Sequence, residues 1–344
     1  MRPNACRKFI EEILCKLGAP GEIAERWAVI QVETSLLGID SHGIRMFDRY
    51  VKHIEGGGIN VEAEPEVVTD KAACAAMDAK GGLGHISADR ATQLALEKAK
   101  AHGASCVTAR NVNHMGACAI YARQAAARDC IGLCLASSRS GIAPWGGKQA
   151  LLGLNPIAVG APVEGKHPFV IDMATTMVAM GKVTRAADLG EAIPDGWALD
   201  ADGQPTTDPN AAIHGTLLPI GGHKGYGIAM AVEMLTSLLS GGVLAPEIKS
   251  WIQQTKDPMG AGFSMISIDI AVFQDPAAFK SRAREWTDLL TGSPRRDGVN
   301  RIYYPGEKEG ECYDERIKTG IPIDERTRTA FEELAKRFDV RLPW

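Results

Sequence analysis

The chain has 344 residues, which is enough for two domains or one large domain. Hydrophobic residues make up 45% of it and charged residues 23%, the usual balance of a globular enzyme. The formal charge of −4 argues against a nucleic-acid-binding protein, which would carry a basic excess. The longest apolar stretch, 228–239, contains Glu233 and is too short to span a bilayer. The amphipathic N-terminus lacks the apolar core of a signal peptide, so neither a membrane protein nor a secreted one is expected.

The eight cysteines indicate a reducing compartment. None of them are spaced as Cys-x-x-Cys, and the nearest pair, Cys130 and Cys134, shares an apolar segment. Buried free thiols in the cytoplasm explain this pattern best. No two histidines stand at the spacing of metal ligands on a helix, so a metal site is not indicated.

The first part of the chain is predicted to be largely helical. Apolar residues between 9 and 14 form one face of a first helix, which glycine and proline residues at 18–21 end. A second helix is predicted over 22–37. A third is predicted over 42–54, with Ser41 as its N-cap and the glycines 56–58 at its end. The next elements are predicted to be a strand over 74–77, a helix over 87–102 and a strand over 105–108.

Beyond about residue 111, short apolar runs alternate with Gly, Pro and Asn. These runs predict a mixed, largely antiparallel sheet, in which 164–167 is a hairpin turn. Asp324 is the expected N-cap of the last helix. The whole pattern predicts an α/β fold with helical N- and C-terminal segments. The predicted strands are 131–136, 157–162, 169–172 and 263–273, and the predicted helices are 117–128, a long buried apolar helix over 226–240, 307–318 and 325–338.

Two motifs are better explained as turns than as ligand sites. The sequence GLGHIS at 82–87 opens a helix, but Ser87 replaces the third glycine of a dinucleotide fingerprint. The next strand also ends without the acidic residue that would hold a ribose. The sequence DADG at 200–203 resembles the start of a calcium loop, but it lacks the later ligands and Pro205 follows it. Both motifs therefore predict tight turns.

One residue after the expected N-cap, His42 is a candidate acid or base. The dipole of the predicted helix disfavours an imidazolium there and should lower the pKa of His42. A neutral imidazole suits proton exchange with a hydroxyl or carbonyl group. Arg45 and Arg49 follow on the same helical face, where they could serve an anionic substrate. The alternative is a capping histidine beside surface arginines.

Two further segments could bind a ligand. His114, in NHMG at 113–116, ends a strand-like segment before a helix, where ligands often bind; a hydrogen-bonded loop histidine is the alternative. The sequence GGHKGYG at 221–227 stands directly before the long apolar helix. Its backbone amides, with Lys224 beside them, form a candidate phosphate site, and a flexible connector is the alternative.

Seven motifs together resemble the malate/L-lactate dehydrogenase family that lacks a Rossmann fold. Its members include ureidoglycolate, sulfolactate and diketogulonate enzymes and cyclic-imine reductases. Any one motif is weak, but seven in family order are specific. The motifs are GIDSHG at 38–43, NHMG at 113–116, APWGG at 143–147 with GLNP at 153–156, IDMAT at 171–175, IPDGWALD at 193–200, GGHKGYG at 221–227 and PGE at 305–307.

The resemblance implies a homodimeric oxidoreductase that holds NAD or NADP in a cleft of a non-Rossmann α/β fold. With the element pattern, it implies a helical and mixed domain at 1–110, completed by 300–344, and a central nicotinamide cofactor-binding domain at 111–299. His42 and His114 match the two histidines to which family members assign proton transfer. The implied cofactor contacts are Ser138, Ile171, Asp172, Met173, Ala174, Thr175, Thr176, Met177, His223, Lys224, Gly306, Glu307 and Lys308.

One departure from the family pattern concerns the substrate. Many members place an arginine four residues after the first histidine, where this chain has Met46. Arg45 is therefore expected to hold the substrate carboxylate, with Arg49 as the second candidate. The expected reaction moves a hydride between NAD(P) and C2 of a small 2-hydroxy or 2-oxo acid, of malate, lactate, sulfolactate or ureidoglycolate type. A cyclic-imine reductase using NADPH and a non-catalytic ligand-binding protein are the alternatives.

Overall fold

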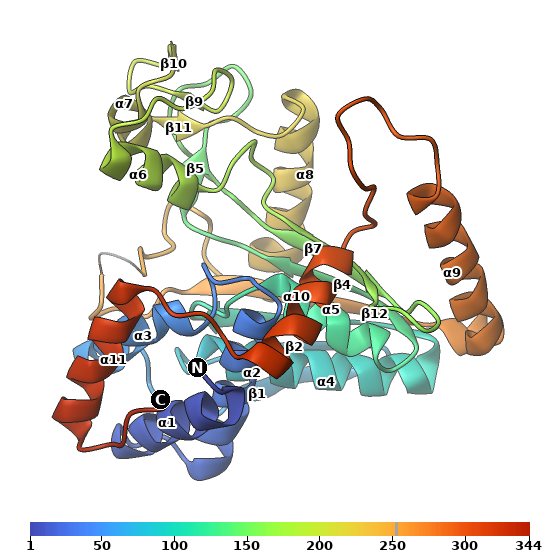
Figure 1. Ribbon diagram of the computed structural model, residues 1–344, viewed down its shortest axis with the longest axis horizontal. Helices are drawn as coiled ribbons and strands as arrows, with labels where there is room; N and C mark the ends of the chain where they lie inside the picture. The colour runs from blue at the N-terminus through green and yellow to red at the C-terminus, as the bar shows by residue number, and fades with distance from the viewer. Residues whose placement is uncertain (252–253) are drawn as a thin grey trace.

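A seven-stranded sheet forms the centre of the computed structural model, which describes residues 1–251 and 254–344 (Figure 1). In sheet order its strands are β1 (Glu66–Lys71), β2 (Cys74–Asp78), β3 (Ala104–Val112), β12 (Ala261–Asp269), β4 (Cys130–Ala136), β7 (Ile157–Ala161) and β8 (Phe169–Met173). The β2–β3 pair is parallel, and the other neighbouring pairs are antiparallel. The prediction of a mixed, largely antiparallel sheet is therefore confirmed.

The parallel pair is joined by α4 (Gly84–His102), so β2, α4 and β3 form a crossover unit. A Cβ atom on Gly84 would lie 2.2 Å from the backbone oxygen of Asn113, which explains why a glycine starts this helix. The GLGHIS motif is thus a strand-to-helix turn, as predicted. The DADG motif is also a turn, in which Asp200 accepts hydrogen bonds from the backbone N–H groups of Asp202 and Gln204.

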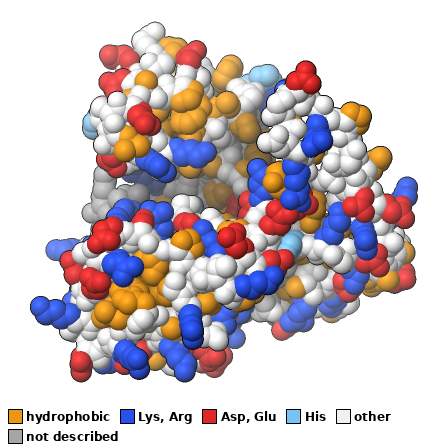
Figure 2. Space-filling view, in the orientation of Figure 1, with side chains coloured by type: hydrophobic (Ala, Val, Ile, Leu, Met, Phe, Trp, Pro, Cys, Tyr) orange, Lys and Arg blue, Asp and Glu red, His pale blue; other side chains and the backbone are white. Residues whose placement is uncertain are grey.

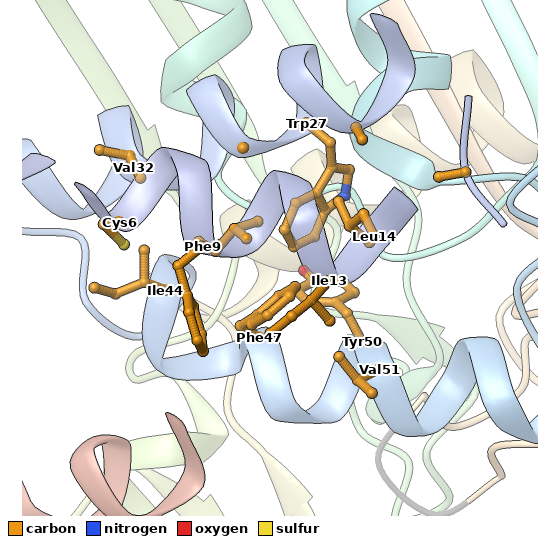
Figure 3. Close-up of a cluster of buried hydrophobic side chains, with 14 of the residues drawn as sticks. Cys6, Phe9, Ile13, Leu14, Trp27, Val32, Ile44, Phe47, Tyr50 and Val51 are labelled. Atoms are coloured by element: carbon orange, nitrogen blue, oxygen red, sulfur yellow. The ribbon is translucent and has the colours of Figure 1, made fainter. Parts of the chain in front are cut away.

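Helices from both ends of the chain share one hydrophobic core. The rings of Phe9 and Phe331 stack with their centroids 4.9 Å apart, which joins the two ends of the chain directly. Figure 3 shows Phe9, Trp27 and Phe47 within this core. Ile86 of α4 also belongs to it. Most of the core comes from α1 (Pro3–Lys16), α2 (Gly21–Leu36), α3 (Phe47–Gly56) and α11 (Glu325–Phe338).

The third predicted helix begins later than expected. A turn at 40–43 and a short 3₁₀ helix, η1 (Ile44–Met46), precede α3. The backbone N–H of Ile44 donates to the Ser35 hydroxyl on α2, so α2 rather than Ser41 satisfies the start of this segment. Ser41 is therefore not a helix N-cap, and the helix-dipole argument for His42 is wrong. The predicted end is confirmed, because Gly57 takes a left-handed conformation after α3.

Three other predicted helices are confirmed near their expected bounds. These are α5 (Cys118–Ala126), α10 (Glu307–Thr319) and α11. At the start of α11 the Asp324 carboxylate accepts a hydrogen bond from the Thr327 backbone N–H, as expected of an N-cap.

A second sheet, which the sequence did not suggest, forms a separate lobe at the top of Figure 1. Its strands are only two or three residues long, too short for a periodic apolar pattern to identify them. A small hydrophobic core that includes Val183 and Leu217 supports the lobe. The elements of the lobe are β5 (Ser140–Ile142), β6 (Leu152–Gly153), α6 (Met180–Leu189), β9 (Ala198–Leu199), β10 (Pro205–Thr206), α7 (Pro209–His214) and β11 (Thr216–Leu217).

The long apolar helix is not fully buried, contrary to its prediction. It begins as α8 (His223–Glu233) and continues as a π-helical segment, η2 (Met234–Leu238). Several of its apolar side chains are exposed in the single chain, including Met234 and Leu238. A further helix, α9 (Pro276–Thr291), follows η3 (Ile270–Val272) and also carries exposed apolar side chains, among them Trp286 and Leu289.

The expected domain boundary at 110 falls inside β3, and strands from both sides of it join the large sheet. All eight cysteines are free, and four of them are buried. Within the described residues, His, Cys, Asp and Glu side chains form no group of three or more that could hold a metal ion. None of the helices over 1–251 and 254–344 has the length and apolar character needed to cross a membrane.

Candidate active site

A cleft of about 1340 Å³ lies between the lobe that carries α6 and the helical part of the molecule. Figure 2 shows this face hollowed there, with Lys and Arg side chains on both edges. The lining includes the segments around His42 and His114, the chain after β4, the end of β8, the start of α6, residues 249–251 and 259–262, and residues 303–309. Of the predicted site residues, those that line the cleft are His42, His114, Ser138, Ile171, Asp172, Met173, Ala174, Gly306 and Lys308.

The side chain of Asn113 fixes the backbone of the NHMG motif through hydrogen bonds. The side-chain amide of Asn113 donates to the backbone oxygens of Gly58, Gly81 and Gly82, and its oxygen accepts from the Met259 N–H. Asn113 is buried and lies directly after β3. These four bonds tie the backbone before His114 to three separate segments and fix where the imidazole lies.

The imidazole of His114 is fixed as well as its backbone. Its Nδ1 atom shares a hydrogen bond with the hydroxyl of Tyr50 on α3, and its ring stacks on Trp251 with centroids 4.0 Å apart. Burial, followed by the charges of the surrounding histidines and Arg49, holds the pKa of His114 well below its usual range. His114 therefore lies in the cleft as a neutral imidazole whose Nδ1 is occupied.

The second histidine lies beside the first. The ring centroids of His42 and His114 are 5.6 Å apart, with the rings nearly parallel. Nδ1 of His42 shares a 2.8 Å hydrogen bond with the hydroxyl of Ser41, which is exposed. Burial lowers the pKa of His42 from its usual value. The predicted direction of this shift is confirmed, but its cause is desolvation and not a helix dipole.

Two buried polar residues behind these histidines were missed by the sequence analysis. The Gln31 side chain on α2 shares a 2.7 Å hydrogen bond with Nε2 of His85 on α4, and both side chains are fully buried. Burial lowers the pKa of His85 to about 3. A Cβ atom on Gly116 would lie 2.7 Å from His85 Nε2, so the glycine of the NHMG motif makes room for this ring. Gln31 and His85 stand outside every motif, and only the fold brings them together.

The opposite side of the cleft is built on β8. The backbone N–H of Ala119, at the start of α5, donates to the Asp172 carboxylate over 2.8 Å. Desolvation inside the cleft raises the pKa of Asp172 to about 6. The N–H of Val170 donates to the Pro305 oxygen, and a Cβ atom on Gly306 would lie 2.7 Å from the Pro168 oxygen. The IDMAT and PGE motifs, far apart in the chain, are thus adjacent.

The other predicted cofactor contacts lie beside the cleft rather than in its lining. The N–H of Met177 donates to Leu218, and that of Ile220 donates to Thr175, which joins the end of the IDMAT segment to the chain before α8. This pairing extends to Thr176. His223 and Lys224 then follow, exposed, in the first turn of α8. Glu307 binds Arg301 at the start of α10.

The two arginines that follow His42 lie in different surroundings. Arg45 forms an ion pair with Asp324 and is absent from the lining of the cleft. Arg49, on α3, also lies outside the lining, but it is half-buried and close enough to lower the pKa of His114. Among the described residues, Arg49 has no ion-pair partner. The structure therefore separates the two candidates and leaves Arg49 near the histidines.

Five cations line the cleft, together with two carboxylates, those of Asp172 and Glu309. Within the described residues none of the five is in an ion pair, although the chain as a whole carries a net negative charge. Unpaired cations in a concave site attract anionic ligands. We call this set the cleft cations: Arg123, Arg139, Lys182, Lys249 and Lys308.

Known proteins resemble the chain over nearly its whole length. The family model described as malate/L-lactate dehydrogenase matches residues 1–332. A malate dehydrogenase of Pyrococcus abyssi is 36% identical over 341 residues, which cover 97% of this chain and 93% of that protein. The structure of the sulfolactate dehydrogenase from Methanocaldococcus jannaschii aligns with a TM-score of 0.92 at 34% identity, covering 99% of this chain and 98% of that one.

A second solved structure is named for a reaction on a cyclic imine. The delta1-piperideine-2-carboxylate reductase from Pseudomonas syringae aligns with a TM-score of 0.87 at 30% identity, covering 97% of this chain and 99% of that one. Fold, motifs and sequence identity therefore agree. The chain belongs to the malate/L-lactate dehydrogenase family, and it is an oxidoreductase of that family.

Proposed function

We propose that the protein transfers a hydride between NAD or NADP and C2 of a small 2-hydroxy or 2-oxo acid. The observation that carries this proposal is the placement of two neutral histidines beside unpaired cations in one cleft. Oxidising an alcohol at C2 requires a base for the hydroxyl proton, and an acid substrate requires a cation for its carboxylate. The histidines would meet the first requirement and the cations the second.

The residues of the cleft fit a nicotinamide dinucleotide. Its volume of about 1340 Å³ exceeds the usual range for a small-molecule site, so it has room for a dinucleotide together with a small acid. Ser138, Asp172, Gly306 and Lys308 would hold the cofactor, and the α8 start with Lys224 would lie near its phosphates. The bound nicotinamide would supply or accept the hydride. We assign this role to the central region 111–299.

We assign the proton transfer to His114. Both histidines are neutral, so their pKa shifts do not distinguish them. Their side-chain contacts do distinguish them. The His114 ring is fixed by the buried Tyr50 hydroxyl and the stacked Trp251 ring, whereas the His42 ring is hydrogen-bonded to the exposed Ser41. With Nδ1 of His114 bound to Tyr50, Nε2 is the nitrogen left to take the hydroxyl proton during oxidation and to return it during reduction.

We assign the substrate carboxylate to Arg49 rather than Arg45. Arg45 would have to leave Asp324 before it could bind an anion. Arg49 is already near His114 and free of a carboxylate partner among the described residues. A guanidinium binds a carboxylate through two parallel hydrogen bonds, which would fix the orientation of C2.

A second candidate function is reduction of a cyclic imine that carries a carboxylate. The structural similarity to the delta1-piperideine-2-carboxylate reductase favours it. The same cleft would serve, because the proton from His114 would go to the imine nitrogen instead of an oxygen. A panel of 2-oxo acids and cyclic imines, each assayed with NADH and NADPH by absorbance at the nicotinamide band, separates the two functions. Absence of turnover across the whole panel contradicts both.

We propose that the protein is a homodimer. The exposed apolar side chains of α8, η2 and α9 support this, since monomers seldom expose large apolar surfaces. Light scattering should then give twice the chain mass of 36.8 kDa. Replacing Leu238 and Leu239 with lysine should yield monomers. A wild-type mass of a single chain contradicts the proposal.

We propose a cytoplasmic location. All eight cysteines are free, and Cys15 and Cys74 are exposed thiols, which are typical of a reducing compartment. Fractionation of the source cells with an antibody to the chain tests this.

A further inference from the structure

A buried tyrosine stands behind the proposed acid/base residue. Tyr50 lies on α3 with 1% of its surface exposed, in the core shown in Figure 3. Its ring packs edge-on against Trp27 and His85 and stacks on Trp251. Its hydroxyl bonds to Nδ1 of His114. A phenylalanine would make the same ring contacts, so the core alone does not explain the hydroxyl.

We infer that Tyr50 is a positioning residue for His114: its phenol oxygen accepts the Nδ1 proton and so keeps Nε2 as the nitrogen that exchanges protons in the cleft. This inference rests on the proposed function of His114. An imidazole that takes a proton at Nε2 carries its second proton at Nδ1. Once the ring is charged, that N–H needs an acceptor, and leaving it unpaired would carry a desolvation cost. The Tyr50 oxygen is the acceptor in contact with it.

Gln31 supplies the next partner. A phenol that accepts from His114 must send its own proton elsewhere, and the adjacent Gln31 carboxamide, whose Oε1 atom has no hydrogen-bond partner among the described residues, is the group that can accept it. A carboxamide can present either end, and the assigned role requires its oxygen to face Tyr50. Burial holds the pKa of Tyr50 well above its usual value, so the phenol stays neutral and does not compete for the proton.

The charged and titratable groups around His114 are the same with or without the Tyr50 hydroxyl. His42, His85 and His53 and the guanidinium of Arg49 all lower the pKa of His114. Tyr50 acts in the other direction, because an acceptor at Nδ1 stabilises the imidazolium. Tyr50→Phe removes this effect alone. It should lower the pKa of His114 still further and release the ring to its other neutral tautomer.

The test combines kinetics with NMR. Tyr50→Phe should lower kcat about 10–100-fold, as expected when the partner that orients a base is lost. The acid limb of kcat/KM for oxidation should move to lower pH, while cofactor affinity stays the same. Tyr121→Phe is the matched control, because Tyr121 is a second buried tyrosine whose hydroxyl donates to a backbone oxygen. Its loss should lower Tm without moving the pH limb.

The NMR arm does not depend on turnover or on the folding of a variant. Nitrogen-15 spectra of histidine-labelled wild-type protein should show neutral His114 protonated at Nδ1. A wild-type His114 protonated at Nε2, a Tyr50→Phe enzyme with unchanged kcat and pH limb, or a limb that moves to higher pH would each overturn the inference. A wild-type enzyme without turnover but with Nδ1 protonation would instead count against the proposed function only.

Discussion

The two functional parts of the cleft are built in opposite ways. His42, Tyr50, His85 and His114, with Gln31, form a histidine cluster that is largely buried and linked by hydrogen bonds and ring contacts. The cleft cations sit on the other segments of the lining, where within the described chain they have no ion-pair partners. The polar groups of the histidine cluster thus find their partners within the protein. The cleft cations lack the negative charges that would neutralise them.

This difference separates two physical tasks. Proton transfer needs a neutral imidazole with a fixed ring, which desolvation and packing supply before any ligand arrives. Anion binding needs charge that is not already neutralised, because a cation held in an ion pair must first give up its partner. The comparison predicts that changes in the histidine cluster act on catalysis and pH dependence, whereas changes among the cations act on ligand affinity.

The largest effect is expected from His114→Ala. Loss of the acid/base group should lower kcat about 10²–10⁴-fold and leave cofactor affinity, measured by fluorescence titration, nearly unchanged. His42→Ala should lower kcat less, because among the described residues the only side-chain hydrogen-bond partner of its imidazole is the exposed Ser41. If kcat falls further in His42→Ala than in His114→Ala, His42 and not His114 is the acid/base residue. If both variants keep normal kcat, the acid/base role of the cluster is wrong.

The next effect concerns Arg49, which stands at the edge of the cluster. Arg49→Met should lower kcat/KM about 10²–10³-fold for acid substrates, since an unpaired desolvated carboxylate costs about 3–5 kcal/mol. Arg45→Met is the matched control. Its ion pair with Asp324 is largely exposed and worth at most about 1 kcal/mol, so kcat/KM should hardly change. The opposite pattern would restore Arg45 as the carboxylate partner.

A smaller effect is expected on stability as the pH falls. His85 has a pKa of about 3 in the folded protein, against about 6.5 in the unfolded chain. Between these values the unfolded chain binds the extra proton, so stability is full above pH 6.5 and falls as the pH drops toward 3. This histidine alone should contribute about 1.4 kcal/mol per pH unit within that window. Urea unfolding at pH 7, 6 and 5 measures the slope, and His85→Asn should make it shallower. An unchanged slope contradicts the buried, neutral His85.

The smallest effect is expected at the start of α8. Lys224→Ala should weaken binding of NADH or NADPH about tenfold, the value of one charge-assisted contact to a phosphate. Lys52→Ala is the control, because Lys52 is exposed and already paired with Asp48. Isothermal titration measures both affinities. If both variants bind the cofactor with equal affinity, Lys224 does not contact it, and the cleft cations alone would bind its phosphates.

The sequence predicted the elements whose signals are local. Asp324 could be identified as an N-cap because its carboxylate bonds three residues ahead, and six of the seven strands of the large sheet carry apolar runs that predict them. The exposed edge strand β1 has no such run and was not predicted. The start of α3 was misplaced because the Ser35 hydroxyl, on the preceding helix α2, accepts the hydrogen bond from the Ile44 N–H that a cap would otherwise satisfy. The exposed face of α8 was misjudged because an apolar pattern does not say what covers it.

The candidate site divides in the same way. His42, His114 and Asp172 belong to motifs, so a resemblance could find them. Gln31, His85 and Tyr50 are ordinary residues on three different helices, and only packing places them against His114 and His42. Arg45 and Arg49 also differ through a tertiary contact, because Arg45 forms an ion pair with Asp324. The spacing of residues within one helix does not reveal such a contact.

Deuterium transfer from the reduced cofactor tests whether the hydride reaches C2 of the substrate. The reduced cofactor, labelled with deuterium at C4 of the nicotinamide, is mixed with enzyme and the 2-oxo acid that turns over best. Hydride transfer to C2 should place one deuterium there in the 2-hydroxy acid, detected as a mass increase of about one unit and as loss of the C2 proton signal in NMR. The experiment is run with the label on each face of the nicotinamide ring in turn, because only one of the two C4 hydrogens is transferred. Product without deuterium at C2 in both runs would contradict hydride transfer to this carbon.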